Sequence, residues 1–359
     1  MKYLAPLLFV LFLQACNSTP PTPVVEEVKK PKNIILLIGD GMGLSQVSSA
    51  YYYKEGTPNF SRFKHVGLSR TSTAKQKVTD SASGATAFSA GVKTYNGAIG
   101  MDVDTMAVPT IVEILSEQSW KTGVISTSSI THATPACFYA HVKLRGMQDE
   151  IAAQLVESDI DFFAGGGQEY FSGNINGRNT FEKLKAAGYT VDTTSLDGAV
   201  AADQRYGYLL DDDGMPRMLD GRGDFLGQST QKALGYFDLS ENPFFLMIEG
   251  SQIDWGGHDN EEDYLVSELL DFDEVIGQVL DYAAQDGETL VIVTADHETA
   301  GYTLASNDGD YAEVKGAFAT DGHSATLVPV FAFGPGAEAF SGVYENNSIF
   351  HKMMKAVGK

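Results

Sequence analysis

Apolar residues along this chain fall into short continuous runs that alternate with longer stretches of helical periodicity. The runs have the length and composition of buried strands, and they lie at residues 33–39, 122–126, 160–164, 243–249, 289–294 and 328–333. Between them, apolar residues recur at helical spacing at residues 108–119, 147–157, 229–237 and 263–285. This alternation predicts an α/β fold: a largely parallel central sheet with helices on both faces, in three layers.

Two stretches depart from this alternation. Residues 168–227 are rich in Gly, Asn and Asp, and we expect them to form a small irregular insertion beside the sheet. Residues 1–15 contain Lys2 and then an apolar run over residues 4–13, which is too short to span a membrane and is typical of an export signal. We therefore expect residues 33–359 to form one domain that carries the insertion.

The segment Leu13-Gln-Ala-Cys16 resembles the lipobox of bacterial lipoproteins. The resemblance implies cleavage before Cys16 and lipidation of its thiol, so that residues 16–32, rich in Pro, Thr, Glu and Lys, would form an extended tether. Simple secretion with cleavage after Ala15 is the alternative. We expect an exported protein, either periplasmic or anchored to the outer membrane through its lipid.

The charge of the chain restricts its partners. With 25 Lys+Arg and 47 Asp+Glu, the formal net charge is −22. This charge argues against nucleic acids and anionic membrane surfaces as partners, because binding to them depends on Lys and Arg. It also repels anionic substrates at long range, so a phosphate site would need its own positive charge, and metal ions could supply it.

Residues 81–91 are nearly all small, and they predict a helix whose backbone other groups can approach closely. Ser81 or the preceding Asp80 can cap the free N–H groups at its start, and Gly91 can end it. Capping is the ordinary role of such residues. The alternative is that the Ser81 hydroxyl is a nucleophile at the positive end of the helix, which requires partners that lower its pKa.

Carboxylate and imidazole side chains gather at the ends of the predicted strands. They are Asp40, Glu249, Asp254, His258, Asp296 and His297, with His323 shortly before the strand at 328–333. Each alone fits a turn or a loop. Open α/β sheets, however, bind ligands beyond the carboxyl ends of their strands, and these residue types are the ligands that zinc and magnesium prefer. The combination predicts a metal site.

These motifs, together with Thr79-Asp-Ser81, occur in the order found in alkaline phosphatases, and the chain resembles that family from Pro31 to its C-terminus. The resemblance implies that one zinc ion is held by Asp254, His258 and His323. A second zinc ion would be held by Asp40, Asp296 and His297. A third metal, normally magnesium, would be held by Asp40, Thr134 and Glu249.

The resemblance also implies an activity. Ser81 would be the phosphorylated nucleophile, and Arg145 would hold the phosphate through its planar guanidinium. Phosphate monoesters would be hydrolysed at alkaline pH through a phosphoserine, with the zinc ions activating Ser81 and stabilising the leaving oxygen. The family further implies a homodimer.

His132 and Trp255 occupy positions that vary within the family, and this pair resembles the cold-active bacterial members. His132, where some other members have Asp, would either favour zinc over magnesium at the third site or weaken the retention of magnesium there. Trp255, where others have Lys or His, would remove a positive charge from the phosphate pocket. We expect weaker phosphate binding and faster product release, although simple packing would explain Trp255 equally well.

Two alternatives remain open at this level. Phosphodiesterases of the same superfamily share the metal motifs, but Ser81 and Arg145 favour monoesters. A non-catalytic lipoprotein with structural metals would keep the Asp and His residues, but it would not need a serine at a helix start together with an arginine.

Overall fold

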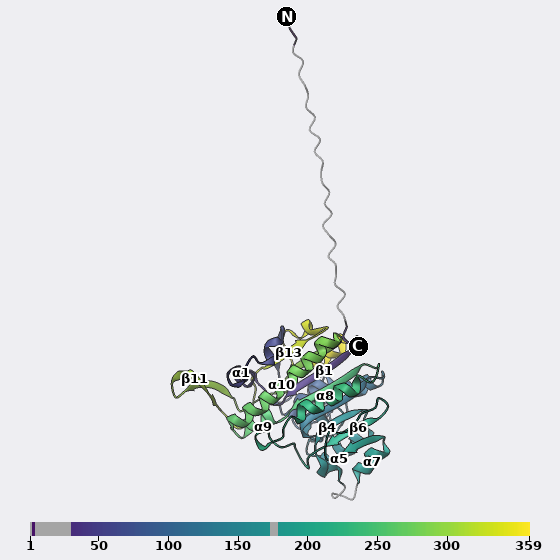
Figure 1. Ribbon diagram of the computed structural model, residues 1–359. Helices are drawn as coiled ribbons and strands as arrows, with labels where there is room; N and C mark the ends of the chain where they lie inside the picture. The colour runs from purple at the N-terminus through teal and green to yellow at the C-terminus, as the bar shows by residue number, and fades with distance from the viewer. Residues whose placement is uncertain (1, 4–29, 173–178) are drawn as a thin grey trace.

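The computed structural model describes residues 2–3, 30–172 and 179–359 (Figure 1). Most of the predicted export signal, Cys16 and most of the tether lie outside the described residues. Within the described residues, the centre of the molecule is a ten-stranded sheet in the order β14-β2-β13-β8-β1-β7-β3-β4-β6-β5. Strand β13 runs antiparallel to β8 and β2, and the other pairs are parallel. The prediction of a largely parallel sheet is confirmed.

The strands of this sheet are β1 (Asn33–Gly39), β2 (His65–Arg70), β3 (Lys121–Ser129), β4 (Phe162–Gly166), β5 (Tyr189–Asp192), β6 (Arg205–Leu209), β7 (Phe244–Gly250), β8 (Thr289–Thr294), β13 (Val328–Phe333) and β14 (Gly342–Glu345). Two small antiparallel pairs are formed by β9 (Glu298–Thr299), β12 (His323–Ser324), β10 (Thr303–Asn307) and β11 (Asp310–Ala317). The helices are α1 (Leu44–Tyr53), α2 (Ser81–Ala90), α3 (Ile111–Ser116), α4 (Ala133–Ala136), α5 (Gln148–Glu157), α6 (Gln168–Phe171), α7 (Thr180–Ala186), α8 (Phe225–Phe237), α9 (Gln252–His258), α10 (Glu262–Asp286) and α11 (Ser348–Ala356).

Helices cover both faces of the sheet because its central strands are apolar on both sides. In β1, Ile34 and Leu36 point into one hydrophobic cluster, which α2, α3, α5 and α11 share. The alternate residues Ile35 and Leu37 point into a second cluster, which α1, α8 and α10 share. Figure 1 shows α8 and α10 lying across this second face. The sheet is therefore the middle of three layers, as the sequence predicted.

The segment 168–227 is more regular than its composition suggested. It contains β5 and β6, which pair in parallel with each other, and β6 pairs with β4 of the central sheet. Its core residues are aromatic: Tyr189 and Tyr208 are buried among neighbouring rings. The expectation of an irregular insertion beside the sheet was therefore wrong for the strand-forming part, because short strands of four or five residues show little periodicity in the sequence.

One hairpin stands apart from the layers. Strands β10 and β11 pair only with each other, and Figure 1 shows β11 projecting away from the sheet. Asp308 and Gly309 both have positive φ in the turn, which is the conformation of a tight hairpin. Among the described residues, no helix has the length and apolar character required to cross a membrane.

Candidate active site

The central strands end side by side at one edge of the sheet, and acidic side chains gather there. Ile38 in β1 is paired with Glu249 in β7 and with Thr294 in β8. Asp40 and Asp296 follow β1 and β8 directly, so these two carboxyl groups join that of Glu249 at the same edge. All three side chains are fully buried. The strand ends therefore concentrate negative charge away from water.

Histidines from three segments approach this edge. His297 follows β8, and its Nε2 lies 3.2 Å from Asp296 Oδ2 and 3.4 Å from Asp40 Oδ1. His258 ends α9, and its Nε2 lies 3.1 Å from Nε2 of His323 in β12. The same Nε2 of His258 is 3.4 Å from Asp254 Oδ2. The structure thus brings together the residues expected for each of the two zinc ions.

Three sets of described side chains offer ligand atoms that all lie within 4.8 Å of one another: Asp254, His297 and His323; Asp40, Asp296 and His297; and Asp40, His132 and Glu249. The second set is the one expected for the second zinc ion. The third set places His132 at ligand distance from Asp40 and Glu249. His132 was expected only beside the third metal, and the geometry makes it a possible ligand.

Several buried atoms of these residues have no hydrogen-bond partner in the described part of the chain. They are both Oδ atoms of Asp40, Asp296 Oδ2, Glu249 Oε1, Thr134 Oγ1 and His132 Nδ1. A buried polar atom without a partner is costly, and native structures rarely leave one. Because these donor atoms are clustered and mostly anionic, a cation of the zinc or magnesium type fits the site and would satisfy them.

The pKa values of these groups also fit a cation-binding site. Burial, and then repulsion by Asp254, raises the pKa of Asp296 to about 6. Burial raises the pKa of Glu249 to about 7, and burial with repulsion by Asp296 raises the pKa of Asp40 well above its usual value. Burial, and then the charge of His323, lowers the pKa of His297 well below its usual value. Neutral imidazole is the form that binds metals.

Ser81 is the first residue of α2, and its side chain does not cap the helix. The cap is Asp80, whose Oδ1 accepts from the Ser83 backbone N–H at 3.0 Å. The Ser81 Oγ instead lies 3.3 Å from His297 Nε2, and Ser81 is 2% exposed. A helix N-terminus favours negative charge at this position. Of the two readings of Ser81, the geometry favours the nucleophile.

Arg145, in the segment after α4, extends its guanidinium to Asp80 and His132 beside the start of α2. Its Nη2 lies 3.0 Å from His132 Nε2, and its Nη1 lies 3.4 Å from Asp80 Oδ2. Burial, and then the charge of Arg145, lowers the pKa of His132 to about 3, so this imidazole is neutral and can accept from the guanidinium. Trp255 stands edge-on to His132, with ring centroids 6.0 Å apart. His132 and Trp255, the two positions that vary within the family, therefore pack against each other.

Sequence reasoning missed residues that hold these groups in place. Ser126 Oγ donates to Glu249 Oε2 at 2.5 Å and lies 2.8 Å from Ser251 Oγ. Thr299 Oγ1 donates to Asp254 Oδ1 at 2.5 Å. The available signal was weak: Ser126 ends a predicted strand and Thr299 follows Asp296 by three residues, but serine and threonine are common at strand ends.

Comparison with known proteins identifies the family. The family model for alkaline phosphatase matches residues 31–317 and 310–359. The chain belongs to the alkaline phosphatase family. It is 31% identical to alkaline phosphatase 3 of Bacillus subtilis (strain 168), over 99% of this chain and 96% of that one.

Solved structures of phosphatases in this family agree with the assignment. The alkaline phosphatase from the Antarctic bacterium TAB5 is 54% identical, covers 92% of this chain and 99% of its own, and superimposes with a TM-score of 0.90. A variant of that enzyme, with a histidine replaced by glutamate and Mg bound in its M3 site, is 53% identical with the same coverage and a TM-score of 0.89. The predicted family and the predicted class of enzyme, a metal-dependent phosphomonoester hydrolase, are confirmed.

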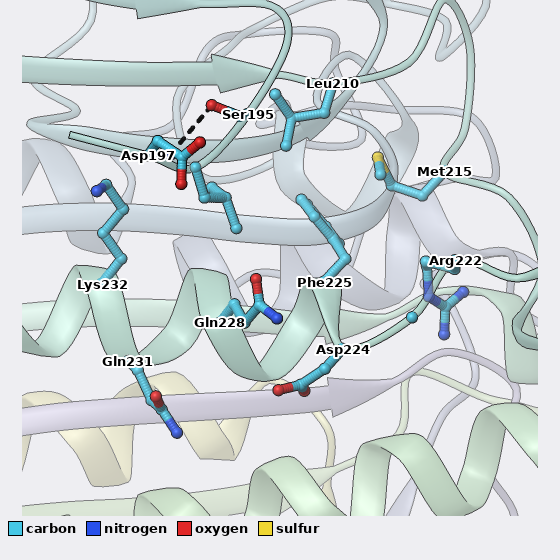
Figure 2. Close-up of a pocket in the computed structure, with 12 residues that line it drawn as sticks. Ser195, Asp197, Leu210, Met215, Arg222, Asp224, Phe225, Gln228, Gln231 and Lys232 are labelled. Carbon is cyan, nitrogen blue, oxygen red and sulfur yellow. Dashed lines mark hydrogen bonds between the residues drawn. The ribbon is translucent and has the colours of Figure 1, made fainter.

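A cavity of about 650 Å³ lies elsewhere in this phosphatase, beside α8 (Figure 2). Leu210, Met215 and Phe225 form apolar parts of its wall, and Lys232 and Arg222 stand at opposite ends in the view. None of the metal or phosphate residues discussed above lines it. The site at the strand ends is therefore distinct from this cavity.

Proposed function

We propose that this site hydrolyses phosphate monoesters through a phosphoserine on Ser81, with two zinc ions and a third metal. Asp254, His258 and His323 would hold one zinc ion, and Asp40, Asp296 and His297 the other. When bound, the zinc ions supply positive charge that lowers the pKa of the Ser81 hydroxyl and stabilises the leaving oxygen. The observation that carries the proposal is the cluster of buried, unpartnered carboxylate and imidazole atoms beside Ser81 Oγ.

Ser81 would attack the phosphorus atom from the start of α2. Backbone N–H groups in the first turn of the helix point toward this position and favour the negative charge that develops there. Because Ser81 is buried, water is largely excluded from the serine, and electrostatic effects are stronger than at a surface. After the alcohol leaves, water would attack the phosphoserine and release inorganic phosphate.

Arg145 would bind the phosphoryl oxygens. Its planar guanidinium can donate two parallel hydrogen bonds, and Asp80 and His132 orient it without burying it: the side chain remains 32% exposed. The exposed fraction leaves donors available for a substrate. Trp255, whose ring packs edge-on to His132, carries no charge, which supports the expectation of weak phosphate binding and rapid release.

The third metal would bind to Asp40, Glu249 and Thr134. We propose that His132 joins them through its unpartnered Nδ1, since the ring lies at ligand distance from Asp40 and Glu249. Binding through Nδ1 puts the ring proton on Nε2, so His132 would no longer accept from Arg145 and Asp80 alone would orient the guanidinium. An imidazole ligand suits zinc better than magnesium. The variant of the TAB5 enzyme with glutamate in place of a histidine holds Mg in its M3 site, and this supports a link between a histidine and the choice of metal.

Export, lipid attachment and dimerisation are also proposed. The apolar run at residues 4–13 and the lipobox-like segment ending at Cys16 support an exported, lipid-anchored protein. The homodimer is proposed from the family resemblance, and Tyr52 on α1 and Tyr311 on the projecting hairpin, 62% and 92% exposed, are candidate interface residues.

The proposal is tested with Ser81→Ala. Purified enzyme is stripped of metal, reloaded with zinc and magnesium, and given an aryl phosphate monoester or the matching diester near pH 9. We expect the wild type to prefer the monoester strongly and Ser81→Ala to lose at least about 10³-fold in kcat, because the nucleophile is gone. Acid quenching should trap phosphate on Ser81 in the wild type.

Ser89→Ala is the matched control, since Ser89 is buried in the same helix α2 and no described residue accepts from or donates to its hydroxyl. We expect it to keep wild-type turnover. Preference for the diester, or turnover that survives in Ser81→Ala, would overturn the proposal.

A further inference from the structure

The three histidines expected to bind the two zinc ions share one arrangement: each holds its Nδ1 against an acceptor and turns its Nε2 toward the site. His323 Nδ1 lies 2.8 Å from the backbone oxygen of Thr79, and His258 Nδ1 lies 2.5 Å from that of Asp321. A carbonyl oxygen only accepts, so both rings carry their proton on Nδ1 and keep a lone pair on Nε2. Metal-binding histidines are commonly fixed in this way.

His297 differs from the other two in the kind of acceptor, because its Nδ1 faces a side chain instead of a backbone oxygen. The partner is Thr299 Oγ1, at 3.2 Å. The same hydroxyl lies 2.5 Å from Asp254 Oδ1. A threonine hydroxyl has one proton to give, and an ionised carboxylate can only accept, so the Thr299 proton goes to Asp254. The Thr299 oxygen then accepts from His297 Nδ1–H, which leaves His297 Nε2 unprotonated.

Thr299 itself is held firmly. It is 1% exposed, and its backbone N–H donates to the backbone oxygen of Gly41 at 3.1 Å. Gly41 has φ of +71°, and a Cβ added there would lie 2.7 Å from Thr299 Oγ1 and 2.8 Å from Asp254 Cα. Asp254, Thr299 and the backbone at Gly41 are thus packed into one unit between the two predicted zinc sites.

We propose that Thr299 is a positioning residue that fixes the tautomer of His297 and the orientation of Asp254, and so couples the two zinc sites. The inference rests on the proposed function, because it assigns Asp254 to one zinc ion and His297 to the other. A single hydroxyl connects a ligand of each. Loss of this hydroxyl frees the His297 ring to take the other tautomer and removes a hydrogen bond from Asp254.

The test compares Thr299→Val, which keeps the shape and removes the hydroxyl, with Thr299→Ser, which restores it. Zinc bound per chain is measured by elemental analysis in buffers of graded free zinc, and kcat/KM is measured after zinc is restored. Thr299→Val should need about 10- to 100-fold more free zinc for half-saturation, the usual effect of losing such a partner. Thr299→Ser should recover most of the affinity.

The control is Thr122→Val in β3, another fully buried threonine whose hydroxyl donates only to a backbone oxygen, that of Asp159. It should leave zinc affinity unchanged. If Thr299→Val binds zinc as the wild type does, or if Thr299→Ser fails to restore the affinity, the inference is wrong while monoester hydrolysis by the wild type still stands. A wild type that neither binds zinc nor hydrolyses the monoester would instead refute the proposed function.

A second measurement needs no variant and covers the case in which Thr299→Val does not fold. In zinc-loaded wild-type protein labelled with ¹⁵N-histidine, His297 should show a protonated Nδ1 and a metal-bound Nε2. A metal-bound Nδ1, or a proton on Nε2, would overturn the assignment of Thr299.

Discussion

At the scale of single residues, the site is a set of groups that destabilise one another until a cation binds. Asp40, Asp296 and Glu249 are fully buried, and burial and mutual repulsion raise the pKa of each. Raised folded-state pKa values mean that these carboxyl groups favour folding while protonated and oppose it once ionised. The metal-free protein should therefore depend on pH in a direction opposite to acid denaturation.

We predict that the metal-free protein is less stable at pH 8 than at pH 6.5. The folded-state pKa of Glu249 is about 7, above its usual value, so the stability that its protonated form gives is complete at low pH and is lost as pH rises through 7. The lowered pKa values of His132 and His297 work against this change, because histidine in the unfolded chain still loses protons between pH 6.5 and about pH 7.5, whereas the raised pKa of Asp40 adds to it. Over this window Glu249 alone should cost about 1 kcal/mol.

The measurement is thermal unfolding of chelator-treated protein at the two pH values. Glu249→Gln should reduce the difference, because it removes one of the titrating groups. If the melting temperature of Glu249→Gln changed between the two pH values by as much as that of the metal-free wild type, the raised pKa of Glu249 would be contradicted.

Much of the site could be predicted from the sequence because its residues follow strands directly. Asp40 and Asp296-His297 come just after β1 and β8, so the parallel sheet alone brings them to one edge. Arg145 and Thr134 were expected only through the family resemblance. The contact between Arg145 and His132 and the place of Thr299 could not be predicted, because side-chain positions in a buried site depend on packing among segments far apart in the sequence.

At the scale of elements, the small side chains of helix α2 let its backbone pack closely against the segment that follows strand β8. Every residue of α2 is buried, and Gly84 lies so close to the strand β8 edge that an added Cβ would be 2.9 Å from Asp296 Cβ and 3.2 Å from the Asp296 backbone oxygen. The helix ends at Gly91, which has φ of +71° and takes the left-handed conformation that favours glycine. The close approach brings Ser81 next to the metal ligands.

We predict that Gly84→Ala lowers kcat by about tenfold or more, because the new methyl group pushes α2 away from Asp296 and misplaces Ser81. Alanine raises the helix propensity, so a weakened helix would not explain the loss. Gly235→Ala in α8 is the matched control: its added Cβ meets nothing within 4 Å, and we expect unchanged kcat with stability equal or up to about 1 kcal/mol higher. Wild-type activity in Gly84→Ala would show that the helix can shift without cost.

Outside residues 168–227, the strands that were predicted and the longer strands that were missed differ in burial. Strands β1, β7, β8 and β13 are buried over nearly their whole length, and their continuous apolar runs predicted them within one residue. The missed β2, β10, β11 and β14 have mixed or exposed patterns, so hydrophobicity alone does not mark them. Their pairing comes from partners distant in the sequence, such as β2 with β13 and β14.

At the scale of the whole molecule, charge is distributed unevenly. The formal net charge is −22, yet residues 56–79 contain Arg62, Lys64, Arg70, Lys75 and Lys77 and no Asp or Glu. Lys75 and Lys77 are exposed on the segment that leads into Ser81. Four residues span at most about 14 Å, so Lys77 lies within roughly one and a half Debye lengths of the site at 0.1 M salt. This basic segment can offset the repulsion of an anionic ester.

We predict that replacing Lys75 and Lys77 together by Gln lowers kcat/KM for a phosphate monoester about two- to fivefold at low salt, with kcat unchanged, since only the approach of the substrate is affected. The difference should vanish near 0.5 M salt, where the Debye length is only a few ångströms. Lys185→Gln on α7 is the control and should change nothing. A deficit that persists at high salt would point to a direct contact instead.

The chain enters the sheet at Asn33, at the start of β1, and Asp40 follows the other end of that strand. An attachment through the preceding residues would therefore join the sheet at the amino ends of its parallel strands. The opening of the active site, its mouth, would lie at the opposite ends of these strands. The expected tether would join the molecule on the side away from this mouth, so esters that diffuse past would reach the site without passing the anchored end of the chain.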